Sequence, residues 1–264
     1  MMRWALLFLL VAAPAAAADE VRPTVVSLDY CADQFVLGLA DREQVRALSK
    51  DAERPFSFLR ERATGLPRVR ALAEDVIALQ PDIVVRSWGG DARALKFYER
   101  MGIRTVQIGY ASDMDGAARV TREVAAALGQ RDRGEALVAA MPHAAPPTGR
   151  SALYVTPGGV TAGKGTMVDA IMHRAGLENA ATGTGWYTLP LESLVMQPPG
   201  LALTAFFGFD DYAFDQWSVS RHPALAYALK DADLVTMTES RLTCPAWFVA
   251  DEAHDVAAAL EAAP

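Results

Sequence analysis

The stretch TVVSLDYCADQFVLGLA, residues 24–40, carries the change of pattern that defines the fold class. Its first five residues form a β-branched run that ends in a polar turn, which is typical of a buried strand. The apolar residues Phe35, Val36 and Leu39 then recur at helical spacing. The stretch therefore predicts a β-strand, a short loop and an α-helix.

The same pattern returns further along the chain. EDVIALQPDIVVRS, residues 74–87, predicts a short helix that ends before Pro81, followed by a buried strand. Residues 94–110 add a helix, a stop at Gly102 and another strand. Strands that alternate with helices indicate a parallel sheet, with ligand-binding loops at the carboxyl ends of its strands.

A second half follows a helical interruption. Residues 112–147 have the pattern of a helix that is broken once near Gly129 and ended by prolines. Strand and helix patterns then alternate again through residues 148–264. We therefore predict an α/β protein with one lobe at 19–111, a connecting helical segment, a second lobe, and a ligand cleft between the lobes.

The first residues predict an export signal. Arg3 precedes an apolar run, residues 4–13, that is too short to cross a bilayer, and residues 16–18 are alanines that suit cleavage. We expect residues 1–18 to be removed and the mature protein to be soluble in the periplasm. The whole chain has 25 basic and 32 acidic side chains and a net charge of −7, which argues against partners such as nucleic acid or anionic membranes.

An enzymatic alternative rests on residues 158–166, GGVTAGKGT, which come within one residue of a phosphate-binding loop. Gly165 stands where the magnesium-binding hydroxyl should be, and an exported protein is not supplied with ATP. The G-x-S-x-G motif of hydrolases is absent from the sequence. We predict that the protein is not an enzyme and that Thr166 caps the next helix, with an exported hydrolase or phosphotransferase as the alternative.

Four segments together resemble one family. They are VVSLDYCADQFVLGLA, EDVIALQPDIVV, TAGKGTMVDAIMHRAGLENA and LPLESLVMQPPGLALTAFF, in this order. The chain is similar to the class III substrate-binding proteins of ABC transporters for vitamin B12, ferric siderophores and haem. The resemblance implies two Rossmann-like lobes with mainly parallel sheets, joined by a long rigid helix. It also implies a monomer that passes a non-covalently bound iron or cobalt chelate to an ABC permease and its ATPase.

The resemblance implies a docking role for two acids. Glu74 and Glu192 occupy equivalent places in the two halves, where members of this family carry surface glutamates that dock on arginines of the permease. The alternative is that both carboxylates complement the dipole at a helix N-terminus.

Ligand contacts are expected in loops after strands, where aromatic residues recur. Rigid aromatic side chains bury flat apolar ligand faces at little entropic cost, which favours a metal chelate over sugars and simple ions. The predicted ligand-binding residues are Tyr30, Cys31, Arg86, Trp88, Tyr110, Trp186, Phe207 and Arg241. Trp186 matches an aromatic position of B12 binders, whereas Trp88 lies one position off theirs. Each arginine could pair with an acid group of the ligand or within the chain.

Candidate metal ligands are few. Tyr30 and Tyr110 could be an axial ligand to haem iron, but residues 49–62, where haem-binding relatives often carry the tyrosine, contain none. Haem therefore ranks below B12 and siderophores. The four histidines have no i, i+4 pairing and predict no zinc or manganese site. Cys31 and Cys244 are expected to be buried thiols, with an interlobe disulfide or a soft metal ligand as alternatives.

Overall fold

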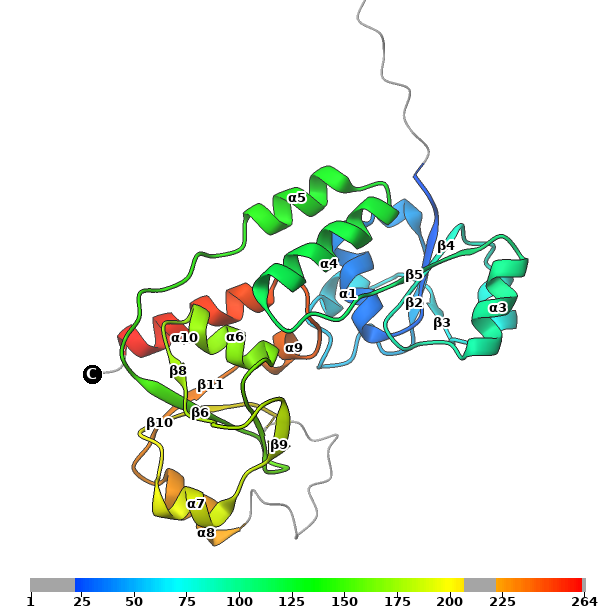
Figure 1. The fold of residues 1–264 in the computed structure, drawn as a ribbon. Helices are drawn as coiled ribbons and strands as arrows, with labels where there is room; N and C mark the ends of the chain where they lie inside the picture. Colours follow the sequence, from blue (N-terminus) through cyan, green and yellow to red (C-terminus); the bar gives the residue numbers. More distant parts are fainter. Residues whose placement is uncertain (1–21, 207–221, 263–264) are drawn as a thin grey trace, which may run out of the picture.

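The first strand and helix form as the sequence predicts, in a computed structural model that describes residues 22–206 and 222–262 (Figure 1). β1 (Val25–Ser27) leads into α1 (Tyr30–Leu39). Asp29 is the N-cap of α1 and accepts a hydrogen bond from the backbone N–H of Ala32. This bond satisfies one of the donors that a helix start leaves free.

The first half of the chain forms a five-stranded sheet in the order β3-β2-β1-β4-β5, and every neighbouring pair is parallel. Parallel neighbours need crossover connections, so helices lie on the faces of the sheet. The other strands are β2 (Val45–Ser49), β3 (Arg68–Val69), β4 (Ile83–Arg86) and β5 (Arg104–Gln107). The helices between them are η1 (Arg42–Gln44), η2 (Arg60–Ala63), α2 (Ala73–Ile77) and α3 (Ala92–Arg100).

Alternate residues of the central strands face opposite layers. Val25 and Val85 belong to a large core that includes α1, whereas Val26 and Val84 pack on the other face with Tyr98 of α3. Side chains along a strand point alternately to the two faces of a sheet. Both faces are covered here, which is why these strands are continuous apolar runs in the sequence.

Two helices connect the halves, α4 (Met114–Ala127) and α5 (Arg131–Ala139). The break between them includes Gly129, whose φ is +69°, as the sequence predicts for a glycine that ends a helix. α4 contacts α1 of the first half and both α6 (Met167–Arg174) and α10 (Val249–Ala262) of the second (Figure 1). α4 is therefore the helix that both halves share.

The second half repeats the first in its strand order. Its sheet is parallel, in the order β11-β10-β6-β8, so β8-β6-β10-β11 corresponds to β2-β1-β4-β5. A short antiparallel ladder joins β7 to β9. The strands are β6 (Ser151–Val155), β7 (Val160–Ala162), β8 (Glu178–Asn179), β9 (Trp186–Thr188), β10 (Leu201–Thr204) and β11 (Asp233–Thr236). The remaining helices are α7 (Leu191–Met196), α8 (Pro223–Leu229) and α9 (Glu239–Leu242).

One hydrophobic core extends through both halves. It contains Phe35 of α1, Val120 of α4, Ile171 of α6 and Phe248, which precedes α10. A large apolar interface restricts the relative motion of two lobes, so we expect them to move as a nearly rigid pair. The predicted α/β class with mainly parallel sheets is confirmed, while the sequence limits of the lobes stay a prediction.

Candidate functional site

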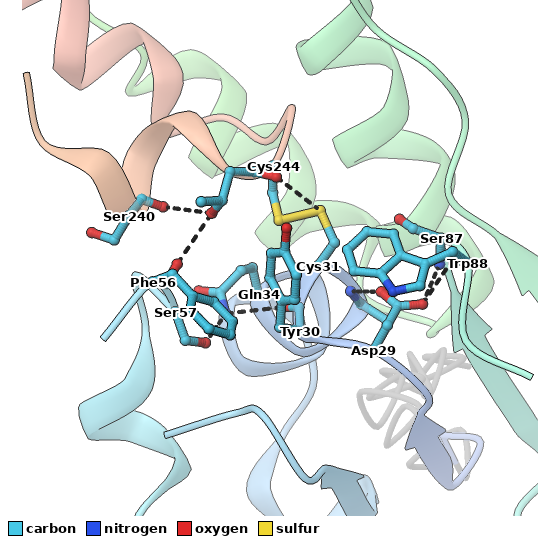
Figure 2. Close-up of a disulfide and its surroundings, with 12 residues drawn as sticks. Asp29, Tyr30, Cys31, Gln34, Phe56, Ser57, Ser87, Trp88, Ser240 and Cys244 are labelled. Carbon is cyan, nitrogen blue, oxygen red and sulfur yellow. Dashed lines mark hydrogen bonds between the residues drawn. A yellow bond between two sulfur atoms is a disulfide. The ribbon is translucent and has the colours of Figure 1, made fainter. Parts of the chain in front are cut away.

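An aromatic group lies beyond the carboxyl ends of the first sheet's strands (Figure 2). It consists of Tyr30, the first residue of α1, Phe56, which follows β2, and Trp88, which follows β4. The Tyr30 ring centroid lies 4.7 Å from each of the other two, with interplanar angles of 65°. This edge-to-face packing is a favoured arrangement. Trp88 is still 50% exposed, so part of its ring is open to a ligand.

The Asp29 carboxylate connects the start of α1 to the turn after β4. Its Oδ1 accepts from the N–H of Ala32 at 2.9 Å. Its Oδ2 accepts from three successive backbone N–H groups, those of Ser87 at 2.7 Å, Trp88 at 3.0 Å and Gly89 at 2.8 Å (Figure 2). The sequence places Asp29 in the loop after the first strand, among the loops expected to contact the ligand, but it does not reveal these hydrogen bonds, because the partners lie about sixty positions away.

Two further predicted aromatic residues are accessible. Tyr110, in the loop after β5, is 79% exposed, and Trp186, the first residue of β9, is 57% exposed. Tyr154 supports Trp186 from β6, with ring centroids 6.0 Å apart and an interplanar angle of 72°. Phe207 lies outside the described residues. Trp88, Tyr110 and Trp186 are thus the predicted ligand aromatics that the structure leaves open.

Arg86, the last residue of β4, is half-buried, and its Nε is buried without a hydrogen-bond partner. A buried donor without an acceptor costs free energy. In the part of the chain that the structure describes, its guanidinium has no acid partner. Arg86 therefore keeps its capacity to bind an acid group.

Arg241 differs, because the chain itself supplies its partners. Its Nη1 pairs with Glu252 at 3.4 Å and makes a closer pair with Asp255. Its guanidinium also lies over the ring of Phe58, 5.2 Å from the centroid, in a cation–π contact. These contacts favour an ion pair within the chain over a pair with an acid group of the ligand, so Arg241 is not part of the proposed ligand site.

Cys31 and Cys244 form a disulfide, with their Cα atoms 5.5 Å apart (Figure 2). The expectation of two free thiols is therefore wrong. The soft metal ligand is also wrong, since a disulfide offers no thiolate. Both cysteines are only 2% exposed, which makes Cys31 a poor ligand contact. Across residues 22–206 and 222–262, no group of three or more His, Cys, Asp or Glu side chains could hold a metal ion.

The disulfide belongs to a segment of the second half, residues 243–248, that packs against the first half; we call it the clasp. Thr243 donates its hydroxyl to the carbonyl of Phe56 at 3.1 Å. Phe248 lies 4.6 Å from Phe58 between ring centroids. Trp247 packs so closely on α1 that a Cβ added to Gly38 would lie 2.1 Å from its Cη2. A glycine inside a helix was the one sequence signal of this contact.

The turn that resembles a phosphate-binding loop has already used its backbone donors. The N–H groups of Gly163 and Lys164 bond to the carbonyls of Gly185 and Gly183, at 2.8 and 2.9 Å. The N–H of Gly165 donates to a carboxylate oxygen of Asp169 at 3.0 Å. A phosphate cradle needs these donors free and no carboxylate beside them. The geometry thus argues against a nucleotide site.

Thr166 is the N-cap of α6, as the sequence predicts: its Oγ1 accepts from the N–H of Asp169 at 3.1 Å. Its hydroxyl donates to the carbonyl of Gly163 at 2.9 Å. The glycine-rich turn therefore ends in an ordinary helix cap.

Asp33, in the first turn of α1, has a buried carboxylate. It accepts hydrogen bonds from the Ser27 hydroxyl and, at 2.9 and 2.6 Å, from the Ser49 N–H and hydroxyl. Burial raises the pKa of Asp33 to about 6, and these hydrogen bonds offset part of the effect. Asp33 thus joins α1 to β1 and β2 and titrates at mildly acid pH.

Glu74 and Glu192 occupy matching places in the two halves. Each is the second residue of its helix, α2 or α7, and each is exposed. The strands that follow, β4 and β10, correspond in the strand order of the two sheets. Near Glu74, Arg70 already pairs with Asp75 at 2.6 Å. Both glutamates therefore face solvent at equivalent helix starts, which is compatible with docking and with dipole complementation.

Several solved periplasmic binding proteins align with this chain. A periplasmic heme-binding protein from Pseudomonas aeruginosa aligns with a TM-score of 0.68 and 23% identity, over 92% of this chain and 95% of that one. The vitamin B12-binding protein BtuF of Vibrio cholerae aligns with a TM-score of 0.62 and 15% identity, over 91% and 97%. An ABC-type Fe3+-hydroxamate transport system from Saccharomonospora viridis aligns with a TM-score of 0.62 and 19% identity, over 93% and 95%.

No protein-family model matches the chain, and a search of curated proteins finds no match. The structural likeness extends over nearly all of this chain and of the three aligned structures. The chain therefore has the two-lobed fold of periplasmic substrate-binding proteins.

Proposed function

We propose that this chain is a periplasmic substrate-binding protein that captures an iron-siderophore or cobalamin-type chelate and delivers it to an ABC importer. The exposed rings of Trp88, Tyr110 and Trp186 on this fold carry the proposal. Such rings bury the apolar faces of a large chelate at little entropic cost. Structures of the same fold that are named for heme, vitamin B12 and Fe3+-hydroxamate support this ligand class.

The proposed ligand site combines these rings with Tyr30 and one cation. Arg86 pairs with no acid group among the described residues, so its guanidinium would form a charge-assisted hydrogen bond with an acid group of the ligand. Siderophores, corrinoids and haem can all carry carboxylate or phosphate groups. The site needs no covalent cofactor, and the metal enters as part of the cargo.

Haem is the second candidate, and the exposure of Tyr110 favours it. A phenolate oxygen can be an axial ligand of haem iron, and Tyr110 is the most exposed of the predicted aromatic residues at 79%. A Tyr110→Phe variant separates the candidates. It should change the absorbance spectrum of a haem complex, whereas a cobalamin or siderophore complex should keep its spectrum because its metal is already chelated.

Export and docking complete the proposal. Residues 1–18 would direct the chain to the periplasm, where a monomer would meet the permease and ATPase of an inner-membrane importer. In the described chain, no helix combines the length and the apolarity needed to span a bilayer. Glu74 and Glu192 would dock on permease arginines, because such pairs are bidentate and orient the approach.

The ligand test is a parallel titration of the chain lacking residues 1–18. Haem, cyanocobalamin and a ferric trihydroxamate are each added while tryptophan fluorescence and heat are recorded. We expect saturable binding of one of them, weakened about tenfold, equivalent to about 1.4 kcal/mol, by Trp88→Ala and by Trp186→Ala. Tyr227→Ala is the control, since Tyr227 is a half-exposed aromatic residue on α8 outside the proposed site. Binding of none of the three would refute the proposal.

The docking test reverses two charges at once. Glu74→Lys/Glu192→Lys should leave ligand affinity unchanged and abolish uptake in cells that depend on this protein. Glu99→Lys/Glu178→Lys makes the same change in net charge at exposed positions of the two halves and should keep uptake. Equal uptake by both double variants would remove the docking role.

A further inference from the structure

The turn after β4 is held by hydrogen bonds from one side chain. Asp29 is only 4% exposed, and its Oδ2 lies within 3.0 Å of the backbone nitrogens of Ser87, Trp88 and Gly89. Successive N–H groups that converge on one oxygen are uncommon in a solvent-exposed turn, where each would bond to water. An ionised acceptor makes such bonds short and strong.

The shape of the turn matches this arrangement. A Cβ added to Gly89 would lie 2.2 Å from the carbonyl oxygen of Leu28, so only glycine lets the two backbones come this close. The Gln107 side chain donates to the Ser87 carbonyl at 2.7 Å from the next strand. The turn is therefore pressed onto the β1–α1 connection, with Asp29 at its centre.

The two residues that Asp29 brings together carry aromatic rings. Tyr30 follows Asp29 in the chain, and Trp88 is the middle of the three residues that donate to Oδ2. Their ring centroids are 4.7 Å apart, and Figure 2 draws both residues near Asp29. The ring contact and the hydrogen bonds to Asp29 thus constrain the same turn.

The corresponding helix start in the second half has an N-cap that does not reach the turn after the next strand. Thr166 is the N-cap at the corresponding place, before α6, and its hydroxyl bonds only within its own turn, to Asp169 and Gly163. Phe206, after the corresponding strand β10, donates its N–H to Glu239 instead. The second carboxylate oxygen of Asp29 therefore has a role beyond capping.

We propose that Asp29 is the positioning residue that sets the Trp88 ring against Tyr30 before ligand arrives, so that this half of the site is already ordered. The proposal rests on the ligand site assigned above. A side chain that is ordered in advance loses less conformational entropy on binding. Without Asp29 the ligand would have to order the turn itself, and affinity should fall about tenfold.

Two substitutions separate the turn from the cap. Asp29→Asn keeps an oxygen for the N–H of Ala32 but turns an amide NH2 toward three N–H donors, and asparagine is a good N-cap. Asp29→Ser also keeps a capping oxygen and removes the second acceptor. Val36→Ala is the stability control, because Val36 is fully buried on α1 and is not among the hydrogen-bond partners of residues 87–89.

The first measurement needs no ligand. Amide hydrogen exchange of residues 87–89 should become at least tenfold faster in Asp29→Asn and Asp29→Ser, while the amides of α1 keep their protection. Val36→Ala should leave residues 87–89 unchanged relative to the rest of the chain. Unchanged exchange at residues 87–89 in both Asp29 variants would overturn the inference.

The second measurement uses whichever of haem, cyanocobalamin and ferric trihydroxamate binds the parent chain. Asp29→Asn should weaken it about tenfold in the parent and have little effect in a Trp88→Ala background, because the position of an absent ring cannot matter. An equal loss in both backgrounds would overturn a role through Trp88. If none of the three binds, the proposed function falls, while hydrogen exchange still decides whether Asp29 holds the turn.

Discussion

Breaking the Cys31–Cys244 disulfide should lower the free energy of unfolding by about 5 kcal/mol. The bond closes a loop with a sequence separation of 213 residues, and a cross-link over a long loop removes much conformational entropy from the unfolded chain. The chain-entropy relation gives about 5 kcal/mol for a loop of this length at room temperature. This is a large share of the roughly 5–15 kcal/mol that stabilises a typical native protein.

The assay is urea unfolding followed by circular dichroism, on oxidised parent, reduced parent and Cys31→Ala/Cys244→Ala. The reduced parent isolates the effect of the bond, because the two thiols keep their buried places. The double alanine variant adds only the loss of two sulfur atoms from the core and buries no new polar group. We expect both to unfold at clearly lower urea than the oxidised parent, with the variant close to the reduced chain.

A thiol count in denaturant checks the bond directly. The chain has two cysteines, so the exported protein should show no reactive thiol before reduction and two after it. Two reactive thiols before reduction would refute the disulfide. Superimposed curves for the oxidised and reduced parent would refute the entropy argument, because they would mean that the disulfide adds nothing to the free energy of unfolding.

Two further predictions concern α1. Asp33 has a pKa of about 6 in the folded protein against an ordinary value of 3.8, so the native state holds a proton that the unfolded chain loses between these pH values. Stability from this group is therefore lost as pH rises from about 4 to about 6. The free energy of unfolding of Asp33→Asn, relative to that of the parent, should rise by up to about 3 kcal/mol between pH 4 and pH 7. A difference in urea unfolding that does not change with pH would contradict this. Gly38→Ala should displace Trp247, shift its emission and cost about 1–3 kcal/mol despite the better helix former. Gly158→Ala, whose added Cβ meets nothing within 4 Å, is the control, and an equal stability for the two alanine variants would contradict the clash.

Local patterns predicted most of the fold. Apolar periodicity, proline stops and the break at Gly129 anticipate the alternation of strands and helices in both halves, and Thr166 caps α6 as expected. These features depend on residues within a few positions of one another, which a single sequence displays. The exposed Trp88 and Tyr110, which follow β4 and β5, were also found in this way, because parallel strands place their following loops at one edge. Trp186 was expected in such a loop, but it is the first residue of β9.

Contacts between distant residues could not be predicted from local spacing. The disulfide, the ion pairs of Arg241 and the hydrogen bonds of Asp29 to residues 87–89 each depend on how separate elements pack. The same residue types would serve equally well as free thiols, a ligand-binding cation and a simple helix cap.

For this protein, the sequence alone determined the order of its elements and the kinds of side chain offered to a ligand. The tertiary structure decided which of those side chains remain available. Trp88, Tyr110 and Trp186 stay open to solvent. Cys31 is bonded to Cys244 in a disulfide, and Arg241 forms an ion pair with Glu252 of another element. The physical reason is that availability depends on burial and on competing partners, and both are set only when elements far apart in the chain come together.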